Sequence, residues 1–317
     1  MSNLTSISEF LLLGFSEVQE LQILHFSVFL AIYLTAVTGN LLIIVAVALD
    51  HHLHTPMYFF LMNLAMLDLG SISVMVPKSM VNSLMNSRSI SYSGCVAQVF
   101  FFISLAGSDL ILLTVMAHDR YVAICNPLRY ETIMHKGACI QMAASAWITG
   151  IFFGTLQTGG TFAITFCSNI VNQFFCEVPQ LLKLSCSDLY LIEVGFLALG
   201  CSLGLACSVF IILTYMQIFA TVLRIPSAQG QKKALSTCLP HLTVVSLFMF
   251  TVLFTYARPS NNSFSSLDIA FAVIYTVIPP MMNPFIYSIR NKELKTALWK
   301  LIVVENSSKT ISRGIVI

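Results

Sequence analysis

The sequence predicts an all-α membrane protein, a seven-transmembrane-helix bundle with a short amphipathic C-terminal helix. Of its 317 residues, 57% are hydrophobic and only 9% are charged, and the mean hydropathy is +0.84. Such a composition could not keep the surface of a soluble protein hydrated. The apolar residues gather in seven long segments, and most Lys and Arg residues fall on one side of them.

The apolar segments set the expected element boundaries, because each is about 20 residues or longer and can cross a hydrocarbon core. They are Leu24–Leu49, Met57–Val76, Val96–Ala117, Ile140–Phe166, Val194–Val222, Leu235–Tyr256 and Leu267–Ile289. We therefore expect three parts. Residues 1–23 form an extracellular N-terminus, residues 24–289 form the seven-helix transmembrane domain, and residues 290–317 form a cytoplasmic tail.

The positive charges predict the orientation. With the N-terminus outside, twelve of the 16 Lys and Arg residues fall in cytosolic pieces, and four fall in outer pieces. The positive-inside rule then predicts a multi-pass protein of the plasma membrane with an extracellular N-terminus. Asn3, in the triplet Asn3-Leu4-Thr5, is then a glycosylation acceptor, with a chance match as the alternative.

The chain beyond residue 290 shows a helical pattern. Leu294, Ala297, Leu298 and Leu301 recur at helical spacing, and Lys292, Lys295 and Lys300 fall on the opposite face. This pattern predicts a helix lying on the inner leaflet of the lipid membrane. The chain has no basic run and a net charge of only +2, so nothing points to a nucleic acid partner.

Four of the nine cysteines fall on the predicted outer face, which is an oxidising environment: Cys95, Cys167, Cys176 and Cys186. Four cysteines allow three pairings, and the spacing does not choose among them. The other cysteines lie in the spans or near the cytosolic face, where we interpret them as small apolar side chains.

Four polar side chains fall within the spans at a shared depth. Asp68, Asp109, Asn40 and Asn283 come out roughly 10–18 Å from the cytosolic face at the helical rise per residue. Burying such groups is costly, so they are usually kept for function or for a polar network. Two alternatives stay open: a hydrated network that fixes helix packing, and a cation site whose occupancy biases a switch.

The clearest motif is the stretch MAHDRYVAICNPL at residues 116–128, which includes Asp119, Arg120 and Tyr121. It resembles the signature MAYDRYVAICxPL of olfactory receptors, a large family of G-protein-coupled receptors. Further stretches resemble the same family in the expected order: SEF at residues 8–10, LHTPMYFFL at 53–61, KALSTC at 233–238 and PMMNPFIYSIRNK at 280–292. The loop at residues 175–188 looks like the second extracellular loop of the tetrapod-type branch.

The resemblance implies an odorant receptor that activates a heterotrimeric G protein with an olfactory, stimulatory α subunit and so raises cAMP. It implies the disulfide Cys95–Cys176, which would pin the outer loop over the bundle mouth, and the disulfide Cys167–Cys186, which would close a second loop. It implies no cofactor apart from Na⁺, which such receptors can hold at the positions of Asp68 and Asp109.

The resemblance also implies a switch at the cytosolic end. Arg120 would be held by Asp119 at rest and freed to engage the C-terminal helix of the Gα subunit. Asn283, Pro284 and Tyr287 match the inner switch of the family, where the proline removes a backbone donor and permits a local bend.

The outer third of the bundle indicates the class of ligand. There the third span presents no carboxylate that could pair with a cationic ligand. We expect a small, mostly apolar volatile molecule that packs on side chains of the third span and is oriented by hydroxyls of the last two. The candidate ligand-binding residues are Phe102, Ile103, Ala106, Gly107, Thr255, Tyr256, Tyr275 and Thr276. The alternative is that these side chains only pack helix on helix.

Two other function classes are less favoured. A membrane transporter or channel is the main alternative, but the chain shows no internal repeat and has an odd number of spans. A membrane enzyme is not expected, because HExxH and GxSxG are absent.

Three positions depart from the family pattern: His118 replaces a tyrosine, Pro240 a serine and Met249 a tyrosine. We expect Pro240 to kink or loosen the start of the sixth span.

Overall fold

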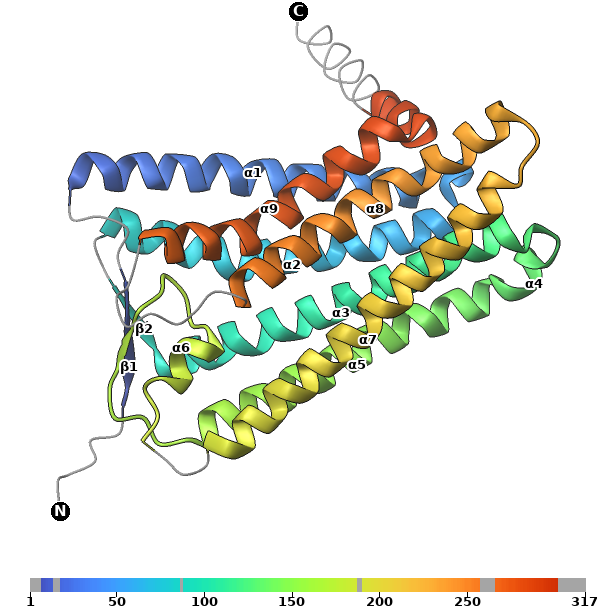
Figure 1. The fold of residues 1–317 in the computed structure, drawn as a ribbon. Helices are drawn as coiled ribbons and strands as arrows, with labels where there is room; N and C mark the ends of the chain where they lie inside the picture. Colours follow the sequence, from blue (N-terminus) through green and yellow to red (C-terminus); the bar gives the residue numbers. More distant parts are fainter. Residues whose placement is uncertain (1–6, 14–17, 86–87, 187–189, 257–265, 302–317) are drawn as a thin grey trace, which may run out of the picture.

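A computed structural model describes residues 7–13, 18–85, 88–186, 190–256 and 266–301, apart from the side chains of 190–194, 251–256, 266–272 and 289–290. Within these ranges, seven helices of 25 residues or more run past one another and form the predicted bundle (Figure 1). They are α1 (Gln19–Leu49), α2 (Pro56–Met85), α3 (Tyr92–Cys125), α5 (Lys136–Ala163), α7 (Tyr190–Leu223), α8 (Ala228–Tyr256) and α9 (Ser266–Arg290).

Six of these helices are long and apolar enough to cross a membrane, judged on the described residues, and α9 is the seventh member of the bundle. The helices extend beyond the predicted apolar segments, since α3 begins at Tyr92 instead of Val96 and α8 at Ala228 instead of Leu235. With 34 residues, α3 is about 51 Å long at 1.5 Å per residue, so its ends project past a hydrocarbon core of about 30 Å.

The helices divide into central and lipid-facing members. In the most apolar stretch of α2, 61% of the residues are buried inside the protein, whereas in that of α7 the share is 11%. Two glycines bring α5 against α3, because a Cβ atom at Gly150 or Gly154 would overlap Ser108 or Ser104. Asp68 of α2 and Ser104 and Ser108 of α3 are among the polar side chains buried inside the bundle.

A small sheet covers one end of the bundle, which we call the cap end. Strand β1 (Glu9–Leu12) lies between β2 (Ser89–Ser91), with which it runs antiparallel, and β3 (Ile170–Val171), with which it runs parallel. The sheet and α6 (Val178–Leu182) lie together at the left of Figure 1. Phe10 and Leu12 are buried, whereas Glu9 and Leu11 are exposed. From the sequence we expected only an extracellular N-terminal segment at this end, and strand β1 was not predicted.

The opposite end carries short turns and the C-terminal helix. The turns are η1 (His51–Leu53), η2 (Pro127–Arg129) and α4 (Tyr130–Ile133). Residues 292–301 are helical, and Asn291 caps them, because its side-chain oxygen accepts the backbone N–H groups of Glu293 and Leu294 at 3.1 Å each.

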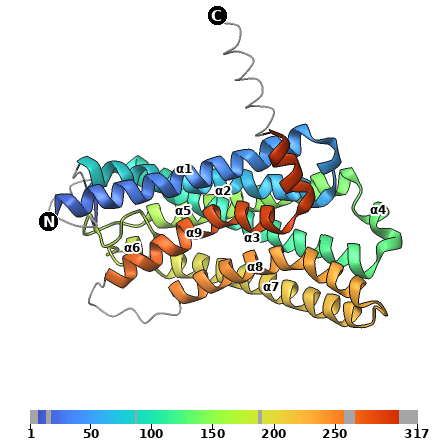
Figure 2. The same ribbon diagram turned by 90° about the horizontal axis from the view of Figure 1, so that it is seen from above.

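The C-terminal helix is amphipathic, as predicted. Leu294 and Ala297 are buried against the bundle, and Lys292, Lys295 and Lys300 are exposed. Lys300 Nζ lies 3.6 Å from an Asp50 carboxylate oxygen just after α1. Figure 2 shows this helix turning away from the axis of α9 beside the end of α1.

Candidate functional site

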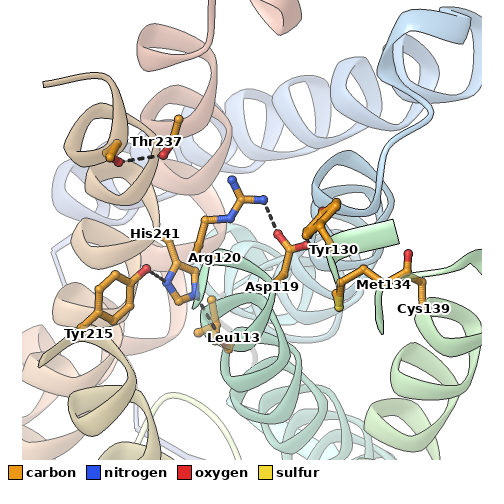
Figure 3. A network of polar contacts seen from close by, with 10 residues as sticks. Leu113, Asp119, Arg120, Tyr130, Met134, Cys139, Tyr215, Thr237 and His241 are labelled. Carbon is orange, nitrogen blue, oxygen red and sulfur yellow. Dashed lines mark hydrogen bonds and ion pairs between the residues drawn. The ribbon is translucent and has the colours of Figure 1, made fainter. Parts of the chain in front are cut away.

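A buried ion pair lies where α3 reaches the opposite end. Asp119 is 1% exposed and pairs with the Arg120 guanidinium. The Tyr130 hydroxyl, from α4, donates a hydrogen bond of 2.7 Å to the other carboxylate oxygen (Figure 3). Burial and the nearby Asp119 charge raise the pKa of Tyr130, so this hydroxyl keeps its proton and stays a donor. Asp119 is therefore held by two partners at once.

His241 joins three helices next to this pair. Its Nε2 lies 3.0 Å from the backbone oxygen of Leu113 on α3, and its Nδ1 lies 2.7 Å from the Tyr215 hydroxyl on α7 (Figure 3). A carbonyl only accepts, so Nε2 carries the hydrogen, and in the neutral ring Nδ1 accepts from Tyr215. The helix α8 runs unbroken from Ala228 to Tyr256 through Pro240, so the proline does not interrupt it.

A cavity of about 360 Å³ opens beside the ion pair. Side chains of α2, α3, α8, α9 and the C-terminal helix line it, among them Arg120, Lys233, Tyr287 and Lys292. The Tyr287 hydroxyl is buried and has no hydrogen-bond partner among the described residues. The cavity is of the size that binds a small ligand or a few side chains of a partner protein.

At one side of this cavity, hydrogen bonds join α2 to the C-terminal helix and to the residue before it. The Tyr58 hydroxyl, on α2, lies 2.8 Å from a Glu293 carboxylate oxygen and 2.9 Å from the Asn291 side-chain oxygen. Tyr121, which follows Arg120 in the motif, stacks its ring against His118 with a centroid distance of 6.4 Å. The C-terminal helix and α2 therefore share one polar boundary of the cavity.

The polar residues predicted at a shared depth form contacts in the middle of the bundle. Asn283 donates to an Asp68 carboxylate oxygen at 2.9 Å, and Asn40 donates to the backbone oxygen of Pro280 at 2.9 Å. Pro284 also approaches α1 closely, because a Cβ atom at Gly39 would lie 2.9 Å from its ring. These contacts fit the interpretation of a network that fixes helix packing.

The surroundings of Asp109 agree with the other interpretation, a cation site. One of its carboxylate oxygens is buried without a hydrogen-bond partner in the described part of the chain, and the same holds for the side-chain oxygen of Asn283. Unpartnered oxygens of this type suit a cation or ordered water. The described residues contain no group of three or more His, Cys, Asp or Glu side chains placed to hold a metal. The residues fit a weakly held Na⁺ better than a tightly bound divalent ion.

Two disulfides hold the cap end. Cys95, in the first turn of α3, pairs with Cys176, and Cys167 pairs with Cys186, with Cα–Cα distances of 5.6 and 5.8 Å. These are the two pairings that the resemblance implies. The Gln98 side-chain oxygen accepts the Cys176 backbone N–H at 2.9 Å, so the loop is fixed to α3 by a second bond.

A carboxylate that the sequence analysis did not consider lies directly after Cys176. The Glu177 side chain is buried, and its oxygens accept hydrogen bonds from the Tyr275 hydroxyl at 2.7 Å and from the Gln173 amide at 3.4 Å. Burial raises the pKa of Glu177, and the Tyr275 and Gln173 hydrogen bonds oppose this shift. The outer third of the third span presents no carboxylate, but the loop supplies one. One signal in the sequence could have identified Glu177. It directly follows Cys176, the cysteine that the resemblance implies pins the loop over the bundle mouth.

The structure brings some predicted ligand-binding residues together and separates others. The Phe102 and Tyr275 rings lie next to each other, with a centroid distance of 6.2 Å and an angle of 55° between their planes. Ile103 packs instead against the buried side chains of the cap, and Gly107 faces Gly150 of α5, whose Cα would lie 3.4 Å from a Cβ added at Gly107. Ala106 is half-buried, and the Thr276 hydroxyl donates to the backbone oxygen of Val273 at 3.3 Å.

The remaining predictions at the cap end lie outside the described residues. These are the side chains of Thr255 and Tyr256 and the acceptor Asn3. Met249, which departs from the family pattern, contacts α7, because the Ser208 hydroxyl lies 3.2 Å from its sulfur. The methionine therefore joins α7 to α8 at this level.

The sequence model of one protein family, described as Olfactory receptor, matches residues 29–305. The chain belongs to the olfactory receptor family. It is 51% identical to Olfactory receptor 14A16 of Homo sapiens over 303 residues, which cover 95% of this chain and 98% of that protein. It is 51% identical to Olfactory receptor 14I1 of Homo sapiens over 304 residues (96% and 98%), and 48% identical to Olfactory receptor 1G1 of Gorilla gorilla gorilla over 303 residues (95% and 97%).

Membership in the olfactory receptor family confirms the resemblance seen in the sequence. It supports odorant reception over the alternative of a transporter or channel. Olfactory receptors are receptors and not enzymes, and an odorant ligand and a G protein are general properties of the family. The apolar helices agree with a multi-pass membrane protein.

Proposed function

We propose that this olfactory receptor binds small, mostly apolar volatile molecules at the cap end and activates a stimulatory, olfactory-type Gα subunit at the opposite end, raising cAMP. The observation that carries the proposal is the restrained Arg120 beside the 360 Å³ cavity. An ion pair whose carboxylate also accepts a hydrogen bond from Tyr130, at the edge of an open cavity, is suited to exchange one partner for another when a protein binds there.

The proposed orientation has the cap end outside the plasma membrane. Residues 1–23 would be extracellular, residues 24–289 would form the transmembrane domain, and residues 290–317 would face the cytosol. The charge asymmetry supports this, because twelve of the 16 Lys and Arg residues then lie inside. The disulfides support it too, since they persist in an oxidising environment. Asn3 would then be a glycosylation acceptor.

The proposed ligand site lies between α3, α8 and α9 beneath the cap. Phe102 and Tyr275 support it most directly, because their rings lie next to each other in the described structure. Ala106, Thr255, Tyr256 and Thr276 complete the proposed lining, and Ile103 and Gly107 border it, because Ile103 packs against the cap and Gly107 against α5. A ligand of about ten heavy atoms at roughly 0.5 kcal/mol each would gain about 5 kcal/mol, which corresponds to a Kd of about 0.1–1 mM. Weak and fast binding suits a volatile stimulus.

The proposed coupling step is an outward movement of α8. This movement would separate His241 from the Leu113 backbone on α3 and from Tyr215 on α7. Arg120 would then leave Asp119 and contact the C-terminal helix of the Gα subunit, with Tyr121 beside it. Asn283, Pro284 and Tyr287 would adjust α9 at the same time, since the Tyr287 hydroxyl is available to a new partner.

We also propose that Na⁺ can occupy the mid-bundle polar site and favour the resting state. Asp68 and Asp109 would hold the ion through carboxylate oxygens, with the Asn283 side-chain oxygen nearby. The ion would offset two buried negative charges that otherwise repel each other.

Replacement of Arg120 tests the proposed coupling. Arg120→Ala should abolish the cAMP response to a panel of neutral volatiles while leaving the receptor at the cell surface, because it removes the group that contacts Gα. Lys295→Ala, which removes an exposed positive charge from the C-terminal helix, is the matched control and should respond normally. An unchanged response of Arg120→Ala would contradict the coupling assignment.

A further inference from the structure

The backbone path fixes where Glu177 can lie. The residue directly before it, Cys176, is bonded to Cys95 at the start of α3, and its backbone N–H donates to Gln98 of the same helix at 2.9 Å. Glu177 is also the residue directly before the short helix α6, whose Leu181 is fully buried in the cap. The carboxylate is therefore held over the bundle mouth.

The hydrogen-bond partners of Glu177 show that its oxygens act as acceptors. The Gln173 side-chain oxygen accepts the Phe174 backbone N–H at 3.3 Å, so the amide NH₂ group is the end that faces Glu177. The Tyr275 hydroxyl donates to the other oxygen at 2.7 Å. Both neighbours donate, and this pattern suits an ionised carboxylate without a hydrogen of its own.

The carboxylate can accept more hydrogen bonds than these two. An ionised carboxylate offers about four acceptor positions, and Tyr275 and Gln173 use one on each oxygen. Lys183 attracts the charge only from an exposed position at the surface of the cap. A buried carboxylate in this state gains from any further donor that reaches it.

Aromatic rings gather around Tyr275, which donates to this acceptor. The Tyr275 ring lies 6.2 Å, centroid to centroid, from both Phe102 and Phe175, and these two rings lie 6.0 Å from each other. A hydrocarbon chain that packs on Phe102 and Tyr275 would bring its polar end close to Glu177. A ligand hydroxyl or amine would donate to the carboxylate. A ketone or ether oxygen would face it as a second acceptor, so that the ligand oxygen would have no partner and the carboxylate would gain no further hydrogen bond.

We infer that Glu177 determines the ligand specificity of this receptor, by accepting a hydrogen bond from ligands that carry a donor, namely alcohols and amines. The inference rests on the proposed function. It narrows the ligand class from small, mostly apolar volatile molecules in general to those that carry a hydrogen-bond donor. Tyr275 is a positioning residue in this site, because its hydroxyl is committed to the Glu177 carboxylate.

The test uses the full-length receptor and three ligands of one carbon skeleton: 2-octanol, 2-octanone and 2-aminooctane. Ligand-induced thermal stabilisation of the purified receptor measures binding, and a cAMP reporter in cells measures signalling. We expect 2-octanol and 2-aminooctane to bind at least about tenfold more tightly than 2-octanone, since a hydrogen bond to a charged group has about that worth.

Glu177→Gln should reduce the alcohol-to-ketone ratio to near one, because an amide both donates and accepts. Glu177→Asp, which keeps an acceptor-only group, should retain the preference at lower affinity. The matched control is Glu9→Gln, which removes an exposed negative charge from the same cap and should leave the ratio unchanged.

The two readouts separate this inference from the proposed function. Donor-selective binding without cAMP would support the role of Glu177 and contradict the proposed coupling. A cAMP response of equal potency to 2-octanol and 2-octanone in the unmodified receptor would overturn the role of Glu177 and leave the coupling intact. An unchanged ratio in Glu177→Gln would also overturn it.

Discussion

The two ends of the bundle are held together by different kinds of bond. At the cap end, two disulfides, a three-stranded sheet and a buried Phe10 join the N-terminal segment to the loops beside α3 and α6. At the opposite end, single hydrogen bonds and ion pairs of Asp119, His241 and Tyr58 join the helices around a cavity. Covalent bonds and strand pairing fix one geometry, whereas single polar contacts can exchange partners. The difference suits a receptor whose ligand end is preorganised and whose coupling end moves.

The largest effect is expected when the Cys95–Cys176 disulfide of the cap is removed. Cys95→Ser should abolish delivery to the cell surface, because loss of a native disulfide costs about 2–5 kcal/mol and this one closes a loop with a sequence separation of 81 residues. Surface labelling of intact cells measures the effect. Cys201→Ser, at an exposed free cysteine, should traffic normally. Normal surface levels of Cys95→Ser would show that the cap does not depend on this bond.

A smaller effect is expected from the non-covalent part of the cap. Phe10→Ala should lower the free energy of unfolding by about 3–5 kcal/mol, because the ring is fully buried between Tyr92 and Phe166 at centroid distances of 5.9 and 5.5 Å. Thermal unfolding of the purified receptor measures the change. The neighbouring Leu11→Ala, at 39% exposure, should change the free energy by less than about 1 kcal/mol. Equal effects of the two variants would mean that the strand is not packed as described.

Substitutions at the opposite end should change the signalling activity of the receptor without unfolding it. His241→Phe removes the bonds to both Leu113 and Tyr215, and we expect basal cAMP to rise a few-fold because the resting position of α8 is weakened. Tyr215→Phe removes one of the two bonds and should raise basal cAMP less. If basal cAMP stayed at the unmodified level in both variants at equal surface amounts, His241 would not restrain the resting state.

The smallest effect is expected from the exposed ion pair between Lys300 and Asp50. Lys300→Ala should change the free energy of unfolding by no more than about 1 kcal/mol, because Lys300 is 61% exposed and water screens the pair. Thermal unfolding at low and high salt provides the measurement. A loss much larger than this would mean that the C-terminal helix is docked through this contact, in disagreement with the burial of Leu294 and Ala297.

Much of the fold could be predicted because membrane helices carry a strong local signal. The apolar segments located all seven long helices, and their ends were misplaced by a few residues, as at Ala228, because polar residues continue a helix beyond the hydrocarbon core. Depth along the helices predicted that Asp68 and Asn283 lie at the same level, since the rise per residue is constant, but it did not predict their contact.

Long-range pairings could not be predicted in the same way. Strand β1 has four residues, and it pairs Phe10 with Ile90 and Leu11 with Ile170, partners that lie far away in the sequence. A segment so short has no periodic pattern that separates it from a loop. Glu177 was missed for a related reason, because depth along a helix says nothing about where a disulfide-bonded loop folds back.

A measurement of distances at both ends tests the central claim most directly. Labels on click-reactive amino acids, which leave the cysteines intact, would replace Glu9 and Lys183 at the cap end and Arg129 and Lys232 at the opposite end, all of which are exposed. When a purified stimulatory Gα subunit is added, the distance between the Arg129 and Lys232 positions should increase, while the distance between the Glu9 and Lys183 positions should stay constant. A change at the cap end that equals or exceeds the change at the opposite end would contradict the account.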